Sequence, residues 1–129
     1  MLQEFVVVPT LPVVALAQAR AFYEDTLGFE PGPGTNEGNA HYVCGQGTQF
    51  LLYQRPTPST ADHTALGFMV ADFDQVFSQL EQSGVKFEIY DLPHLKTDER
   101  GVATDDAGSR TAWFKDPGGN ILAIGEFSR

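Results

Sequence analysis

The sequence has a single cysteine, Cys44, among its 129 residues. One thiol cannot form a disulfide within the chain, so a small fold held together by disulfides is excluded. A zinc site built from several cysteines is excluded for the same reason. A chain of this length buries roughly two-thirds of the surface that its unfolded form exposes, which is enough for a core without cross-links. We expect Cys44 to be a small buried apolar side chain and not a nucleophile.

Long apolar runs are also missing. No stretch approaches the roughly 18 apolar residues that a membrane-spanning helix needs. The first residues contain an acid, Glu4, and no basic group, so they do not match a signal peptide. The sequence therefore predicts a cytoplasmic protein with no membrane partner.

Basic residues are scarce: 8 lysines and arginines stand against 17 aspartates and glutamates, which gives a net charge of −9. A surface of this sign repels phosphates, so we expect no nucleic-acid partner. The excess of acid either attracts a cationic ligand or only keeps the protein soluble.

What the sequence does contain is a pattern of elements that occurs twice. The first copy begins with a short β-branched strand, Glu4–Val8, followed by apolar residues at helical spacing up to Gly28. Two strands are then expected at 40–45 and 48–54. The segment 55–62 is rich in Pro, Ser and Thr and is expected to link the two copies.

The second copy repeats this order. A strand is predicted over Thr64–Val70, followed by a helix with its apolar residues on one face. Either Asp72 or Asp74 supplies the N-cap of this helix, and Gly84 ends it. A further strand is expected at 85–91.

Two strands close the chain around the turn Asp116–Gly119, where proline fixes φ and glycine accepts a positive φ. The last strand is apolar on both faces, which indicates dry surroundings on both sides. The long polar stretch Leu92–Ser109 is expected to be a loop. We therefore predict one α+β domain of two tandem βαβββ modules, 1–58 and 61–129, whose sheets curve around a cavity.

Three stretches carry a family resemblance, in this order along the chain: ARAFYEDTLGFE, VADFDQVFSQLEQSGVKFE and AWFKDPGGNILAI. They resemble the two helical units and the closing hairpin of the vicinal oxygen chelate superfamily, the group of glyoxalases, bleomycin-resistance proteins and extradiol dioxygenases. The resemblance implies the glyoxalase/bleomycin-resistance fold and a homodimer. A fold of this kind serves metalloenzymes and metal-free binders alike, so it does not settle activity.

Metal-dependent relatives hold their ion with His and Glu side chains on four strands. The resemblance places these four positions at hydrocarbon side chains: Val8, Leu51, Ala65 and Ala123. Hydrocarbon supplies no donor to a divalent ion, and an ion without ligands in an apolar cup is strongly disfavoured. The resemblance therefore predicts no metal and no cofactor.

Three histidines leave one alternative open. A displaced metal site could use His41, His63 and His94 with an acid from the long loop, although their spacing matches no known motif.

Alternation along the predicted strands assigns one face to the helices and the other to the cavity. The cavity face carries small, apolar side chains and a few polar groups, as in many ligand pockets. The residues expected to bind a small-molecule ligand there are Val8, Gln49, Leu51, Tyr53, Ala65, Met69, Trp113 and Ala123.

Three functions remain open. The first is a metal-free protein that binds a hydrophobic or cationic small molecule. The second is a glyoxalase-like lyase, isomerase or dioxygenase, with displaced metal ligands or with acid–base chemistry by Tyr53, His41 or His63. The third is an accessory module without a ligand. The missing metal ligands and the acidic balance favour the first.

Overall fold

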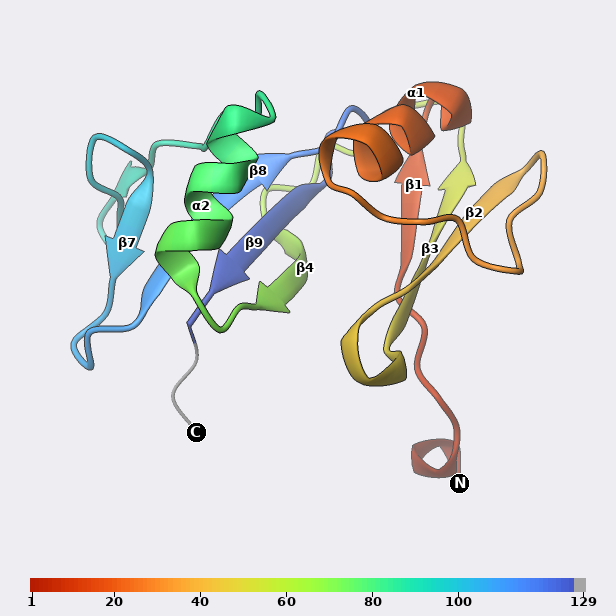
Figure 1. Ribbon diagram of the computed structural model, residues 1–129, viewed down its shortest axis with the longest axis horizontal. Helices are drawn as coiled ribbons and strands as arrows, with labels where there is room; N and C mark the ends of the chain where they lie inside the picture. Colours follow the sequence, from red (N-terminus) through yellow and green to blue (C-terminus); the bar gives the residue numbers. More distant parts are fainter. Residues whose placement is uncertain (127–129) are drawn as a thin grey trace.

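The computed structural model describes residues 1–126, which form two β-sheets side by side, each with a helix packed against it (Figure 1). The first sheet has the strand order β1-β3-β2, the second has the order β4-β9-β8-β7, and β5 and β6 form a small hairpin. The elements are β1 Thr10–Val13, α1 Leu16–Ala21, β2 Asn39–Val43, β3 Gln49–Gln54, β4 Thr64–Met69, α2 Phe73–Gln82, β5 Asp91–Leu92, β6 Leu95–Lys96, β7 Val102–Thr104, β8 Arg110–Lys115 and β9 Ile121–Gly125.

β3 is the central strand of the first sheet. β1 runs parallel to it, with Thr10 opposite Leu51, and β2 runs antiparallel, with His41 opposite Leu51. The helical segment between β1 and β2 joins α1 to a π-helical turn and ends where Gly28 adopts a φ of +85°. The sequence predicted this end because a positive φ after a helix favours glycine.

The first strand begins later than predicted. The expected strand Glu4–Val8 is wrong, because these residues precede β1 and are exposed to solvent. Leu11 and Val13 are the residues that reach the core, with 2% and 1% of their surface exposed. β-branched residues favour a strand, but they do not show which residues will be covered.

The two strands expected at 40–45 and 48–54 follow the first helix as β2 and β3, but the described residues of this half do not form the third strand that a βαβββ module requires. Residues 29–36 form a loop beside β2, and the N–H of Gly32 donates to the carbonyl of His41 (2.6 Å). Pro31 and Pro33 flank this point and have no N–H, so they cannot extend a ladder of hydrogen bonds. The first half is therefore a βαββ unit.

The second sheet is built around β8 and β9, which pair antiparallel, while β4 runs parallel to β9. The side chain of Asp72, and not of Asp74, caps α2 by accepting from the N–H of Gln75 (3.2 Å). Gly84 follows the helix with a φ of +93°, as predicted. Among the described residues, no helix has both the length and the apolarity to cross a bilayer.

The segment between α2 and β8 differs from the prediction in two ways. Of the strand expected at 85–91, the structure forms a single bridge between Phe87 and Phe114, and Asp91 begins β5. The expected loop Leu92–Ser109 instead contains the second strand of the β5–β6 hairpin and all of β7. The sequence did not reveal these strands because they are only two or three residues long, too short to show an apolar periodicity.

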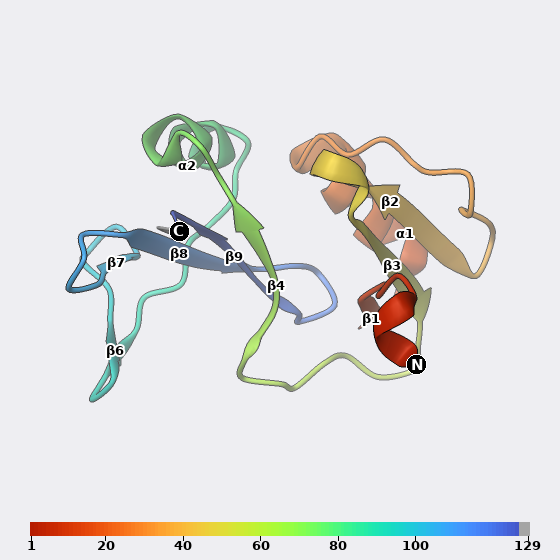
Figure 2. The same cartoon turned by 90° about the horizontal axis from the view of Figure 1, so that it is seen from below.

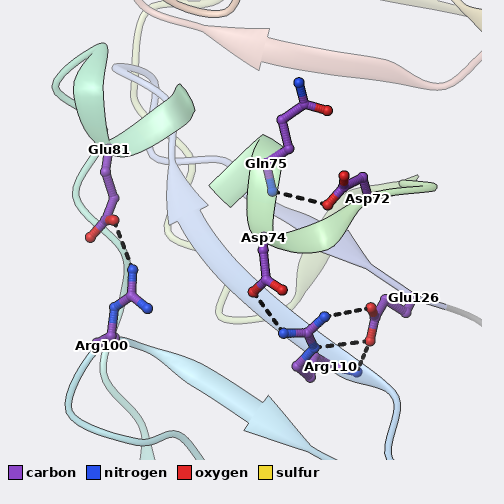
Figure 3. Close-up of polar contacts among 7 residues, drawn as sticks. All are labelled: Asp72, Asp74, Gln75, Glu81, Arg100, Arg110 and Glu126. Atoms are coloured by element: carbon purple, nitrogen blue, oxygen red, sulfur yellow. Dashed lines mark hydrogen bonds and ion pairs between the residues drawn. The ribbon is translucent and has the colours of Figure 1, made fainter. Parts of the chain in front are cut away.

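Two arginines hold α2 against the second sheet (Figure 3). Arg110 donates to Asp74 near the start of α2 (2.7 Å) and to Glu126 after β9 (2.8 Å), and its guanidinium lies over the ring of Phe73. Arg100 donates to Glu81 near the other end of α2 (3.0 Å). The helix is therefore tied at both ends.

The two halves share one core. Phe29 and Phe50 of the first half both pack against the ring of Phe68 on β4, and Phe22 packs against Phe114 on β8. Aromatic pairs of this kind add stability beyond their buried area. The shared core sets the first sheet at a defined position beside β4.

A buried hydrogen bond also joins the halves. The hydroxyl of Tyr23 donates to Asp116 (2.7 Å), and both residues are almost completely buried. The other oxygen of Asp116 accepts from the backbone N–H groups of Gly118 and Asn120. Burial raises the pKa of Tyr23, and the negative charge of Asp116 raises it further.

Candidate functional site

A groove lies between the turn that joins β2 to β3 and the outer strand β4 of the second sheet. Figure 2 shows β4 on the side of its sheet that faces the first sheet. The groove has two sections, of about 360 and 350 Å³, which share the lining residues Cys44, Thr48, Gly67 and Phe68. The first section is completed by Val7, Pro9, Gln49, Phe50 and Leu66, and the second by Gly45, Gln46 and Met69.

The turn side of the groove is a compact bend of glycines. The N–H of Cys44 donates to the carbonyl of Thr48 (2.6 Å), which closes the bend between β2 and β3. Gln46 and Gly47 both adopt positive φ, a conformation that glycine takes without strain. The bend brings the thiol and hydroxyl side chains of Cys44 and Thr48 to the groove.

The β4 side of the groove is open because of a glycine. A Cβ atom placed on Gly67 would meet no other atom within 4 Å. Gly67 lies opposite Ala123 on β9, which in turn lies opposite Trp113 on β8. Small side chains at Gly67 and Ala123 therefore leave space on this part of the sheet.

Gln49 is a polar side chain of the groove that a hydrogen bond holds in place. A ring nitrogen of His41, Nε2, lies 2.6 Å from the amide oxygen of Gln49. An amide oxygen only accepts, so Nε2 is the donor in this contact, and the buried Nδ1 of His41 has no hydrogen-bond partner within residues 1–126. The Gln49 amide N–H groups make no hydrogen bond with any of residues 1–126, so they can donate to a ligand.

The thiol of Cys44 is neutral. Burial raises its pKa above the ordinary value for a cysteine. A thiolate is the reactive form, so the environment suppresses nucleophilic chemistry. Cys44 therefore serves as a small, weakly polar part of the wall.

The eight predicted site residues do not all meet in this groove. Gln49 and Met69 line it. Leu51 and Tyr53 are half-buried on β3, Ala65 is exposed on β4, Trp113 is half-buried on β8, and Ala123 is buried on β9. Val8 lies in the exposed segment before β1. The structure thus brings together a part of the predicted set.

Trp113 and Ala123 lie on a different surface of the second sheet from its core. Ala123 is buried, but it is not part of the core cluster that contains its neighbours Leu122 and Ile124. Trp113 packs edge-on against Tyr90, and its indole N–H donates to the hydroxyl of Thr64 (3.1 Å). These contacts hold Trp113 on the sheet, outside the lining of the groove.

The three histidines lie in different surroundings. His41 is bonded to Gln49, His63 is exposed beside β4, and His94 is exposed at the β5–β6 hairpin. Within residues 1–126, no three His, Cys, Asp or Glu side chains gather in a way that could hold a metal ion.

Several groove residues were not predicted. Thr48 and Phe68 were expected within the strands 48–54 and Thr64–Val70, and Cys44 was expected as a small buried apolar side chain. They reach the groove because the β2–β3 bend lies beside β4, which is a consequence of how the halves pack. The cluster of glycine, glutamine and threonine in this bend is the one local signal of an exposed polar turn.

A larger hollow, of about 510 Å³, lies on the helical side of the molecule. Its lining includes Leu27 and Gly28 at the end of the first helical segment and Val76 and Leu80 of α2. A smaller apolar pocket of about 200 Å³ continues from it toward Phe29 and the shared core. None of the residues predicted to bind a ligand lies there.

Comparison with known proteins gives the family. The chain matches the family described as Glyoxalase/Bleomycin resistance protein/Dioxygenase superfamily over residues 6–124. No functionally curated protein matches it by sequence.

Solved structures share the fold over nearly the whole chain. A glyoxalase/bleomycin resistance protein from Catenulispora acidiphila is 26% identical, with a TM-score of 0.69, and the alignment covers 96% of this chain and 99% of that one. Lactoylglutathione lyase from Agrobacterium tumefaciens is 21% identical, with a TM-score of 0.70 and coverage of 95% and 93%. The bleomycin resistance determinant encoded on transposon Tn5 is 17% identical, with a TM-score of 0.69 and coverage of 97% and 99%.

These likenesses confirm the predicted fold and leave the metal as a separate question. The positions that the resemblance assigns to metal ligands carry hydrocarbon side chains in this chain, at Val8, Leu51, Ala65 and Ala123. Such residues do not fit a divalent cation, which needs nitrogen, oxygen or sulfur donors. The sequence match, the two curved sheets with one helix each and the solved structures agree: the chain belongs to the glyoxalase/bleomycin resistance protein/dioxygenase superfamily.

Proposed function

We propose that this protein binds a neutral, largely apolar small molecule in the groove between the β2–β3 turn and β4, without a metal ion. The observation that carries the proposal is the lining itself. None of the residues that line the two sections is charged, and one amide, that of Gln49, is held by a hydrogen bond. Apolar walls with a few fixed polar groups are typical of small-molecule sites.

The lining favours a neutral ligand over a cationic one. The acidic residues that give the chain its net charge of −9 lie outside the groove lining. A cation that enters the groove loses its hydration, and the lining offers no carboxylate in exchange. The free energy of this desolvation strongly disfavours binding. A neutral molecule with a hydrogen-bond acceptor instead meets the free N–H bonds of Gln49.

The lining also favours binding over catalysis. General acid–base chemistry needs a group that exchanges a proton at the reaction centre. The polar groups of the groove are amides, a hydroxyl and the protonated thiol of Cys44. His41 borders this set, but its Nε2 proton is already donated to Gln49.

A fluorescence titration with the neutral dye Nile red tests the proposal. The dye carries a carbonyl acceptor and brightens in apolar surroundings, so it reports entry into the groove. We expect saturable binding at one site per chain. Gly67→Leu places a side chain in the open space of the groove and should abolish the signal. Thermal unfolding of the variant shows that the fold is intact.

Gln49→Ala tests the polar contact separately. Loss of one neutral hydrogen bond costs about 1 kcal/mol, which corresponds to roughly fivefold weaker binding of Nile red. Gln75→Ala is the matched control, because this glutamine is exposed on α2 and does not line the groove. Equal affinity of the wild type and Gly67→Leu, or a stoichiometric metal ion in the purified protein, would contradict the proposal.

A further inference from the structure

The hollow on the helical side of the molecule is a space that the proposed function does not use. It has a volume of about 510 Å³ and lies between the end of the first helical segment and α2 (Figure 1). Leu27, Val76 and Leu80 line both this hollow and the neighbouring apolar pocket of about 200 Å³. The two spaces are therefore continuous, and we call the hollow the outer part and the pocket the inner part.

The inner part is lined by apolar residues from both halves of the chain. Besides the three shared residues, its walls are Phe29, Phe68, Val70, Phe114 and Ile124. Phe114 and Ile124 are buried, whereas the other three are only half-buried, so the core leaves a part of their surface uncovered. A ligand that covers apolar surface in this way is stabilised by the hydrophobic effect. The inner part therefore suits a hydrocarbon chain.

The outer part is more polar than the inner part. Its lining adds four uncharged polar or small residues that the inner part lacks, Thr26, Gln79, Gln82 and Ser83. Asp25 is its one charged residue among residues 1–126, and it is exposed. The neighbouring Glu24 binds Arg20, but Asp25 makes no ion pair within the described part of the chain. A carboxylate is therefore available to a ligand here.

Both helical segments also end at the outer part. The first ends at Thr26, and α2 ends at Gln82. The last carbonyls of a helix have no partner within it, and the negative end of the helix dipole lies there. No backbone N–H of residues 1–126 donates to the carbonyl of Thr26 or to that of Gln82. These acceptors and Asp25 together favour a cation.

We propose that the two parts form a second binding site, which takes an amphipathic amine: a small molecule with a short alkyl chain and an ammonium group at one end. The chain lies in the inner part, and the ammonium group lies beside Asp25 in the outer part. Because the outer part is open to solvent, the ammonium group keeps some of its water, and its charge is not buried without a partner. The net charge of −9 adds a general attraction for a cation.

This amine site is distinct from the groove of the proposed function. Of the residues that line the amine site, only Phe68 also lines the groove. The groove lining contains no charged residue, whereas the outer part contains Asp25. The two sites therefore favour ligands of different charge, and each can be tested without the other.

An NMR titration of the isotope-labelled full chain with octylamine tests the amine site. We expect saturable shifts of the backbone amides of Gly28, Val76 and Gln82, while those of Thr48 and Gly67 in the groove stay in place. Each methylene group that leaves water is worth about fourfold in affinity, so butylamine should bind roughly a hundredfold more weakly.

Asp25→Asn tests the head group. Wild-type protein should bind octylamine about fivefold more tightly than octanol, which has a similar chain without the charge, and the variant should lose this preference. Asp106→Asn is the matched control, because Asp106 is also an exposed acid but does not line the site, and the preference should persist. Octanoate should bind wild-type protein less tightly than octanol.

Val76→Phe tests the alkyl chain. Val76 is half-buried on α2 and lines both parts, so a larger ring fills the passage between them and should weaken octylamine binding about tenfold or more. Val14→Phe is the matched control, because Val14 is exposed and lies outside the lining. Circular dichroism shows whether the variants fold, and the exposed position of Asp25 makes Asp25→Asn a test that does not depend on core packing.

Three results would overturn the amine site. They are the absence of saturable octylamine shifts at Gly28 and Val76, equal affinities for octylamine and butylamine, and octylamine binding that is unchanged in both Val76→Phe and Asp25→Asn. Equal affinities would show attraction by charge alone. Gly67→Leu should leave octylamine binding intact, so loss of Nile red binding in the groove and loss of octylamine binding are separate outcomes.

Discussion

Asp116 is a buried carboxylate whose two oxygens accept hydrogen bonds from Tyr23, Gly118 and Asn120. Burial of a charge is unfavourable unless it is paired or fully hydrogen-bonded, so each of these donors matters. The turn residues Gly118 and Asn120 lie close in the chain, whereas Tyr23 comes from the other half. The side chain of Tyr23 thus converts a local turn into a link between the two halves.

Tyr23→Phe removes this link without changing the ring. One oxygen of Asp116 then loses a donor in a buried site, and we expect the free energy of unfolding to fall by about 1.5–3 kcal/mol. Urea denaturation measures the change. Tyr90→Phe is the control, since the Tyr90 ring packs on Trp113 and its hydroxyl makes no hydrogen bond with the described residues. An equal loss in the two variants would contradict this role for Tyr23.

The same tyrosine gives a pH dependence. The pKa of Tyr23 and that of Tyr42 are both raised in the folded protein, chiefly by burial. Above about pH 10, the ordinary tyrosine pKa, these groups ionise in the unfolded chain before they do so in the folded protein. The unfolded state then binds fewer protons, so stability should fall as the pH rises. Urea denaturation at several alkaline pH values should show a shallower decline for Tyr23→Phe.

At the scale of the element, α2 shows how one helix is fixed at its start. The carboxylate of Asp72 accepts from the backbone N–H of Gln75, while Asp74, two residues later, binds Arg110 instead. The two acids looked equivalent in the sequence. Their roles differ because Asp72 lies before the first helical residue and Asp74 lies on the exposed side of the first turn.

Asp72→Ala should therefore destabilise the protein by about 1 kcal/mol through loss of the N-cap. Asp72→Asn should retain most of the stability, because an asparagine also caps a helix. Urea denaturation of both variants is the measurement. A loss in the asparagine variant as large as in the alanine variant would indicate that charge, and not capping, accounts for the effect.

Arg110→Lys tests the ties around α2. A lysine keeps the positive charge but lacks the planar guanidinium of Arg110. It therefore cannot bind Asp74 and Glu126 and cover the ring of Phe73 at the same time. Hydrogen exchange of the α2 amides should become faster in this variant. Lys96→Ala is the control, because its ion pair with Asp91 is long, at 3.8 Å, and exposed. Unchanged exchange in Arg110→Lys would show that α2 is held by its apolar face alone.

At the scale of the whole molecule, the order of the elements could be predicted because their ends carry local signals. Gly28 and Gly84 end the two helical segments, and Asp116–Gly119 forms the predicted turn. These signals depend on residues close in the chain. The start of β1 could not be predicted, because Val6 and Val7 have the same strand preference as Val13 but lie outside the core.

The candidate site could be predicted in part for the same reason. Alternation along a strand identifies which side chains share a face, and it pointed to Gln49 and Met69. It cannot show that the bend at Cys44–Thr48 lies beside β4, because that placement depends on contacts between the halves such as Phe50 with Phe68. The groove is a product of packing between segments that are distant in the chain.

The bond between Tyr23 and Asp116 joins residues 93 positions apart, and the ring contacts around Phe68 also cross between the halves. Neither half can bury its aromatic rings alone, so neither should be stable as a separate fragment. Cleavage of the peptide backbone at the exposed residue Thr57 would consequently leave a nicked protein whose two pieces remain associated and co-migrate until a denaturant separates them.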